Sequence, residues 1–161
     1  MDLKIIRADL SCPSQATAMV ELLDAYARDP MGGGRGLSEA VKSSLAAELH
    51  ARSFAHCLLA YLNDKPVGLL NGFEGFSTFA AKPLFNIHDI AVLAEYRSQG
   101  IASQLLREAE RLALELGCCK LTLEVLAGNE PARRVYRRSG FVGYALDPKM
   151  GEALCMEKKL S

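Results

Sequence analysis

The chain has 161 residues, enough for one ordinary domain with a substantial hydrophobic core. Its 19 lysine and arginine residues balance 19 aspartate and glutamate residues, which argues against a broad nucleic-acid-binding or membrane-binding surface. No apolar run is long enough to cross a bilayer, and residues 1–4 open a strand rather than a secretory leader.

The five cysteines are an odd number and show no Cys-x-x-Cys spacing. This pattern is typical of reduced thiols rather than of a disulfide framework or a zinc site. We therefore expect a cytoplasmic protein without a bound metal.

The first half of the chain alternates between strand and helix patterns. Apolar residues recur at helical spacing in two segments, and Ser38 is a suitable N-cap for the second. Pro30 and four glycines interrupt the chain between these two helices. The predicted order is strand 3–8, helix 12–28, break 29–36, helix 37–53, strand 54–62, turn 63–66 and strand 67–76.

The second half continues the alternation after a loop at 78–83. Asn129 is a good N-cap, Pro131 fits a first helical turn, and Gly140 can end a helix in the left-handed conformation. The predicted order is strand 86–93, helix 100–117, strand 120–126, helix 130–139, strand 141–146 and strand 153–159.

A phosphate-binding loop is predicted where strand 86–93 meets helix 100–117. Gly100 lies at the turn, where it lets the backbone approach a ligand closely, and the first free amides of a helix attract anions. The sequence contains no Walker A motif, and residues 32–36 lack the spacing and the preceding strand of a dinucleotide fingerprint. The pattern that fits is Arg/Gln-x-x-Gly-x-Gly/Ala, met by Arg97, Gly100 and Ala102.

This loop resembles the pyrophosphate-binding loop of the GNAT N-acetyltransferase superfamily. A second block supports the resemblance, because residues 129–141 match the superfamily pattern Asn-x-x-Ala-x-x-x-Tyr-x-x-x-Gly-Phe. The two blocks occur in the expected order, and the resemblance is firm over roughly residues 86–143. It implies one α/β domain over residues 1–161, with a mixed, mostly antiparallel sheet of about seven strands, splayed into a V and flanked by four helices.

The resemblance also implies a binding site for acetyl-CoA as cosubstrate. The diphosphate would lie on the amides of residues 98–103, with Arg97 as a further contact, and the pantetheine arm would slot into the V. The residues expected to hold acetyl-CoA are Ile90, Ala91, Val92, Arg97, Ser98, Gln99, Gly100, Ile101, Ala102, Ser103, Asn129, Ala132 and Tyr136.

Acetyl transfer to an amine needs a proton donor and a proton acceptor. Tyr136 coincides with the tyrosine that protonates the departing thiolate in this superfamily, and a phenol with a pKa of about 10 suits that role. The base is less clearly specified. His88 and Asp89 are both candidates, and strand alternation predicts that they face opposite sides of the sheet. Glu74 on the preceding strand is a third candidate.

The acceptor is expected to be a small-molecule primary amine, because acidic residues and the segment 75–83 resemble those of polyamine-type members. The glycine-rich residues 31–36 are expected to form a flexible lid. Protein or peptide N-acetylation, and a catalytically silent CoA-binding sensor on the same fold, remain as alternatives. Tyr136 favours the enzyme, because a sensor needs no proton donor. We also expect a homodimer.

Overall fold

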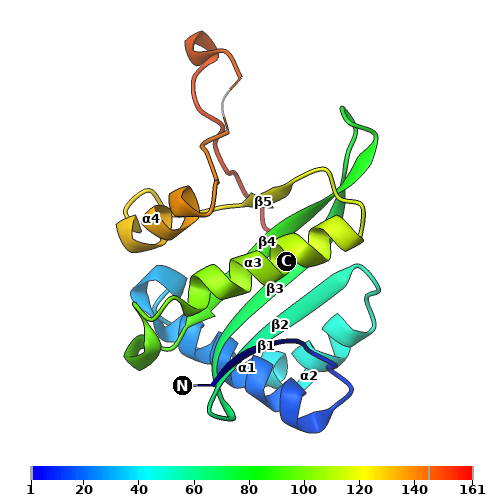
Figure 1. Ribbon diagram of the computed structural model, residues 1–161, viewed down its shortest axis with the longest axis vertical. Coiled ribbons are helices and arrows are strands. Elements are labelled where there is room, and N and C mark those ends of the chain that lie inside the picture. Colours follow the sequence, from blue (N-terminus) through cyan, green and yellow to red (C-terminus); the bar gives the residue numbers. More distant parts are fainter. Residues whose placement is uncertain (1, 145, 161) are drawn as a thin grey trace.

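The computed structural model describes residues 2–144 and 146–160, and its elements follow the predicted order as far as the fourth helix (Figure 1). Turn residues Asn63 and Asp64 both have positive φ, as a tight two-residue hairpin between β2 and β3 requires. The elements are β1 (Leu3–Arg7), α1 (Pro13–Arg28), α2 (Glu39–His50), β2 (Ala55–Leu62), β3 (Lys65–Ser77), β4 (Lys82–Val92), α3 (Ile101–Glu115), β5 (Leu121–Leu123) and α4 (Glu130–Arg138), with short 3₁₀ turns η1 (Pro30–Gly32), η2 (Ala94–Tyr96) and η3 (Pro148–Met150).

The sheet has the order β1-β2-β3-β4-β5. The first four strands are antiparallel neighbours, and β5 lies parallel to β4 after the α3 crossover. The predicted mixed, mostly antiparallel sheet is therefore confirmed, and so is the number of four α-helices among the described residues.

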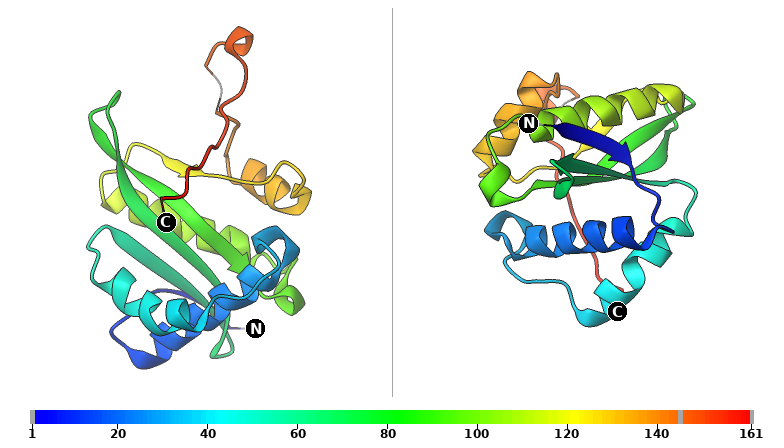
Figure 2. Two further views of the ribbon diagram at one scale, coloured as in Figure 1. Left: turned by 180° about the vertical axis from the view of Figure 1, so that it is seen from behind. Right: turned by 60° about the horizontal axis from the view of Figure 1, so that its bottom comes forward.

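Helices cover both faces of the sheet (Figure 2). Helices α1 and α2 pack on one face, where Met19, Leu59 and Leu69 are fully buried. Helix α3 packs on the other face, where Leu58, Phe85 and Leu105 are fully buried, and α4 adds Val135 and Tyr136 to this second core. We call these the α1 face and the α3 face.

Strands β4 and β5 are paired over only three residues, from Phe85 opposite Leu121 to Ile87 opposite Leu123. Strand β4 continues to Val92, whereas the chain leaves the sheet after Leu123. The edge of residues 88–92 that faces away from β3 is therefore not paired with β5. This divergence is the predicted V.

The expected count of seven strands is wrong, because the described residues form five. The strand predicted at 120–126 is reduced to β5. Residue 145 of the strand predicted at 141–146 lies outside the described residues, and neither the described part of that segment nor 153–159 pairs with another strand within this chain. An alternating pattern gives strand propensity, but a strand also needs a neighbouring backbone to bond with. Figure 1 shows this C-terminal segment leaving the body beyond α4, with η3 at its far point.

None of the helices built from residues 2–144 and 146–160 is both long and apolar enough to cross a membrane. Within the same residues, no group of three or more His, Cys, Asp or Glu side chains is placed to hold a metal ion.

Candidate active site

The predicted phosphate loop leads directly into the first turn of α3. Gly100 is the N-cap in the left-handed conformation, with φ 80°, and no side chain caps the helix. A Cβ built at Gly100 would meet nothing within 4 Å, so backbone conformation rather than crowding favours glycine here. The amides of Ile101, Ala102 and Ser103 occupy the first turn, where helical amides have no partner within their own helix. The loop is thus open and presents donors to an anion.

Arg97 does not point freely into solvent. Its Nη2 donates to Asp29 Oδ2 at 2.8 Å, and its Nε donates to the Val92 carbonyl at 3.1 Å. The hydrogen bond from Arg97 is the main reason that the pKa of Asp29 lies below its usual value. Arg97 and the Val92 carbonyl, both expected to contact acetyl-CoA, therefore contact each other in this structure.

A β-bulge in β4 changes the expected directions of His88 and Asp89. Pairing with β3 passes from Asn71 opposite Asp89 to Gly72 opposite Ile87, so His88 is an extra residue. The His88 ring lies 5.4 Å from the Phe73 ring, and Asp89 accepts a hydrogen bond from Asn71. Asn71 and Phe73 are two residues apart on β3 and so point to the same face. The prediction of opposite faces is wrong, because the bulge places both side chains on the α1 face.

Asp89 lies near Tyr26, and Tyr26 in turn lies near Tyr136. The pKa of Tyr26, in the last turn of α1, is raised first by burial and then by the negative charges of Asp89 and Asp29. Burial, with a smaller contribution from Tyr26, raises the pKa of Tyr136 to about 12. Tyr26 therefore interacts electrostatically with both Asp89 and Tyr136. Sequence reasoning placed Tyr26 only on an apolar helix face, where nothing distinguishes it from a core tyrosine.

Helix α4 holds Tyr136 in place through its N-terminus and its neighbour Phe141. Asn129 Oδ1 accepts a hydrogen bond from the Ala132 amide at 3.3 Å, as predicted for an N-cap. The half-buried Tyr136 ring meets Phe141 edge-on, with ring centroids 6.0 Å apart. A phenol with a pKa of about 12 remains protonated at neutral pH, so Tyr136 is available as a proton donor.

Glu74 lies on the α3 face, away from His88 and Asp89. It stands opposite the buried Phe85 in the β3–β4 register, and its carboxylate lies 2.7 Å from His56 Nε2. The structure thus separates the third candidate base from the other two.

Ile90, Ala91 and Val92 alternate as expected, with Ile90 and Val92 against the α3-face core and Ala91 against the α1-face core. Each pairs with β3 on one side, and β5 has already diverged on the other. Their backbone therefore lines the V.

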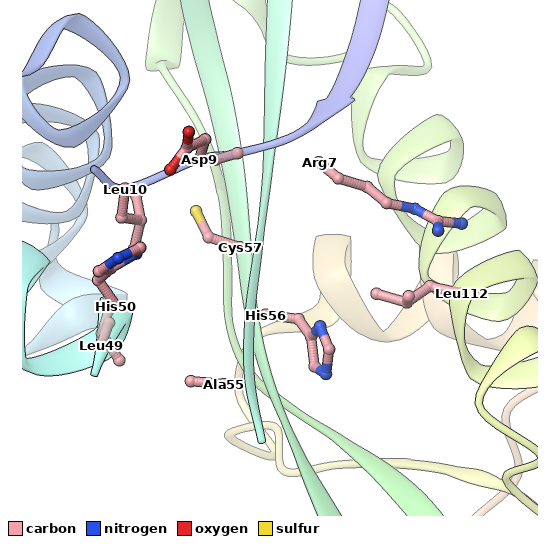
Figure 3. A pocket seen from close by; sticks show the side chains of 10 residues that line it. Arg7, Asp9, Leu10, Leu49, His50, Ala55, His56, Cys57 and Leu112 are labelled. Carbon is pink, nitrogen blue, oxygen red and sulfur yellow. The ribbon is translucent and has the colours of Figure 1, made fainter. Parts of the chain in front are cut away.

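Two hollows lie elsewhere on the surface. The first, of about 270 Å³, is lined by none of the predicted site residues. Figure 3 shows that two of its lining residues, His56 and Cys57, point to opposite sides of β2. The second, of about 710 Å³, lies between α3 and residues 138–142 and includes only Ser103 of the predicted set.

The family model for the acetyltransferase (GNAT) family matches residues 16–141. The chain belongs to the GNAT acetyltransferase family. The predicted family resemblance is thereby confirmed.

Relatives in this family act on different acceptors. The chain is 34% identical over 95 residues to a thialysine N-epsilon-acetyltransferase of Bos taurus, over 54% of this chain and 55% of that protein. It is 32% identical over 94 residues to an N-alpha-acetyltransferase of Arabidopsis thaliana, over 53% of this chain and 44% of that protein. The match thus spans about half the length of these curated relatives.

The fold also matches solved structures of this family. AAC(6')-Iy, in complex with the bisubstrate analogue CoA-S-monomethyl-acetylneamine, has a TM-score of 0.76 and 15% identity, with all of both chains covered. This likeness concerns the fold, since the sequences have diverged widely.

Proposed function

We propose that this protein transfers the acetyl group of acetyl-CoA to a primary amine of a small molecule, by direct attack in a ternary complex. One observation carries the proposal. Tyr26 interacts electrostatically with both Asp89 and Tyr136, and β4 runs from Asp89 along the V and leads through η2 to the phosphate loop at Gly100. The whole chain, residues 1–161, is proposed as the unit that does this.

Acetyl-CoA would bind along the edge of β4 and the first turn of α3. The amides of residues 98–103 would hold the diphosphate, with Arg97 released from Asp29 to join them. The backbone of residues 90–92, with Asn129 and Ala132 at the start of α4, would hold the pantetheine arm.

The reaction needs proton transfers at both ends of the reacting atoms, from the acceptor nitrogen and to the departing sulfur. Asp89, with His88 beside it on the same face, would take a proton from the acceptor ammonium. The free amine would attack the thioester carbonyl, so that a C–N bond forms and the C–S bond breaks. Tyr136 would give its proton to the departing thiolate, and the second proton that the nitrogen loses as the amide forms would restore the phenol. The products are an amide and the CoA thiol, and Asp89 releases its proton to solvent.

The acceptor is proposed to be cationic before it reacts. The carboxylates of Asp29 and Asp89 both act on Tyr26, which marks a region of negative charge on the α1 face. This charge favours an alkylammonium. The thialysine acetyltransferase among the relatives also acts on a small amine. A protein N-terminal amine stays an alternative because of the N-alpha-acetyltransferase relative.

We also propose a cytoplasmic homodimer. All five cysteines are free thiols, in keeping with a reducing compartment. The C-terminal segment exposes large apolar side chains, including Val142 at 89% and Met156 at 88%, which a second copy would cover.

A panel of small amines and N-terminal peptides, assayed by mass spectrometry with thiol release measured alongside, tests the function. Acetylation of a small amine with stoichiometric thiol release is the expected result. Binding of acetyl-CoA without transfer to any amine or peptide would instead support the silent sensor. Transfer to peptides alone would support the protein-acetylating alternative.

A further inference from the structure

Asn71 is a buried amide with only half of its hydrogen bonding satisfied. It lies on β3 with 3% of its surface exposed, and its Nδ2 donates to Asp89 Oδ2 at 3.2 Å. Its Oδ1 is the one buried side-chain nitrogen or oxygen without a partner among the described residues. Native proteins rarely leave such an atom unpaired, so its situation needs an explanation.

The chemistry of Asp89 provides one. An ionised carboxylate only accepts hydrogen bonds, so it can pair with Asn71 Nδ2 but never with Oδ1. A protonated carboxyl has one donor and keeps an acceptor. It can therefore pair with a primary amide through two hydrogen bonds at once, one in each direction. Asn71 Oδ1 would gain a partner only when Asp89 carries a proton.

Apart from the His88 imidazole, the other groups that face Asp89 offer no competing cation. The groups that face Asp89 are Tyr26 from α1, Cys57 from β2 and His88 from β4 itself. Burial, with a smaller contribution from the charge of Asp89, raises the pKa of Cys57 to about 12 and keeps it a neutral thiol. Among the described ion pairs, none joins Asp89 to a lysine or arginine.

We propose that Asn71 is a positioning residue that enables Asp89 to accept and hold the proton of the acceptor ammonium. The proton passes from R–NH₃⁺ to the Asp89 carboxylate, giving R–NH₂ and a neutral carboxyl. The new O–H donates to Asn71 Oδ1, while Nδ2 continues to donate to the other carboxyl oxygen. This inference rests on the proposed function only for the source of the proton.

Asp89→Asn tests the paired arrangement without any need for turnover. Asparagine at position 89 resembles the protonated carboxyl, because it also offers one donor and one acceptor to the Asn71 amide. We expect the melting temperature at pH 7 to rise by about 2–4 °C or more, since a buried orphan acceptor gains a partner. Acetyl transfer should fall at least ~100-fold, because the proton acceptor is lost.

A matched control is Asp64→Asn, in the exposed hairpin turn, which should change neither the melting temperature nor the rate. A melting temperature for Asp89→Asn at or below that of the wild type would overturn the paired arrangement. Retention of the wild-type rate would overturn the role of Asp89 as proton acceptor.

Asn71→Leu tests the positioning role through the pH profile. The substitution removes two hydrogen bonds from the protonated Asp89 carboxyl but only one from the carboxylate, so Asp89 should hold its proton less tightly and the acid limb of the rate profile should move to lower pH. Ser77→Ala removes another buried polar side chain of β3 and should leave that limb in place. A limb that stays in place or moves to higher pH in Asn71→Leu would overturn the positioning role of Asn71.

If no amine is acetylated at all, carboxyl titration followed by ¹³C NMR replaces the rate profile, and Asp89 should titrate at lower pH in Asn71→Leu than in the wild type. Identical titrations in the two proteins would refute the inference, whereas the amine panel alone decides the proposed function.

Discussion

Asp29→Asn should increase the affinity for CoA, because Asp29 holds Arg97 away from the phosphate loop. The substitution removes the charge that binds Arg97 Nη2 at 2.8 Å. Asparagine keeps a side-chain oxygen that can accept from the Met31 amide, as Asp29 Oδ1 does at 2.9 Å, so the cap of η1 is preserved. The perturbation is therefore confined to the ion pair.

The magnitude follows from the exposure of the pair. The Arg97 side chain is 52% exposed and that of Asp29 is 20% exposed, so solvent screens much of the attraction. A partly exposed pair of this kind contributes about 0.5–1 kcal/mol, which corresponds to a roughly 2- to 5-fold lower Kd for CoA once Arg97 is free.

Calorimetric titration of CoA into both proteins measures this effect. Asp24→Asn is the matched control, because Asp24 lies on α1 shortly before Asp29 and pairs with Arg28 and Lys42 but not with Arg97. Its Kd should equal that of the wild type. In an Arg97→Ala background, Asp29→Asn should have no effect. An unchanged or weaker Kd for Asp29→Asn alone would refute the reasoning that Asp29 competes for Arg97.

Three further predictions concern the chemistry and the assembly. Tyr136→Phe keeps the ring against Phe141 and removes only the phenol that donates the proton. Turnover should therefore fall roughly 10²- to 10⁴-fold with little change in the Kd for acetyl-CoA. An unchanged kcat would mean that another group protonates the thiolate. Activity should climb from acidic to mildly alkaline pH, and Tyr136 should keep its proton throughout because its pKa is about 12. His88→Ala or Asp89→Asn should alter that climb, and wild-type profiles in both variants would place the base elsewhere. Removal of residues 142–161 should convert the dimer to a monomer in light-scattering measurements, and a dimer that survives the truncation would place the interface on the body of the protein.

The parts of the fold that local sequence patterns specify were predictable. Helix α4 begins after the Asn129 cap and ends before Gly140, where φ is 87°, because capping acts within a few residues. The left-handed Gly100 at the start of α3 follows from the same local reasoning.

Features that depend on distant partners were not predictable. The bulge at His88 arises because β4 has one residue more than β3 between two neighbouring pairs of the ladder. At the same place, the Phe85 ring packs where a Cβ of Gly72 would lie. The contact of Arg97 with Asp29 joins residues 68 positions apart, and no local pattern indicates it. The C-terminal segment has the alternation of a strand but no partner strand within this chain.

Thermal unfolding with and without acetyl-CoA tests the central claim most directly. Ligand binding to the native state stabilises it by about 2.7 kcal/mol at a hundredfold excess over Kd, so acetyl-CoA and CoA should raise the melting temperature by several degrees. Gly100→Val should abolish this shift, because its backbone conformation at φ 80° is strained for valine and the side chain would obstruct the loop. A melting temperature that rises with ATP or NAD but not with acetyl-CoA or CoA would contradict the account.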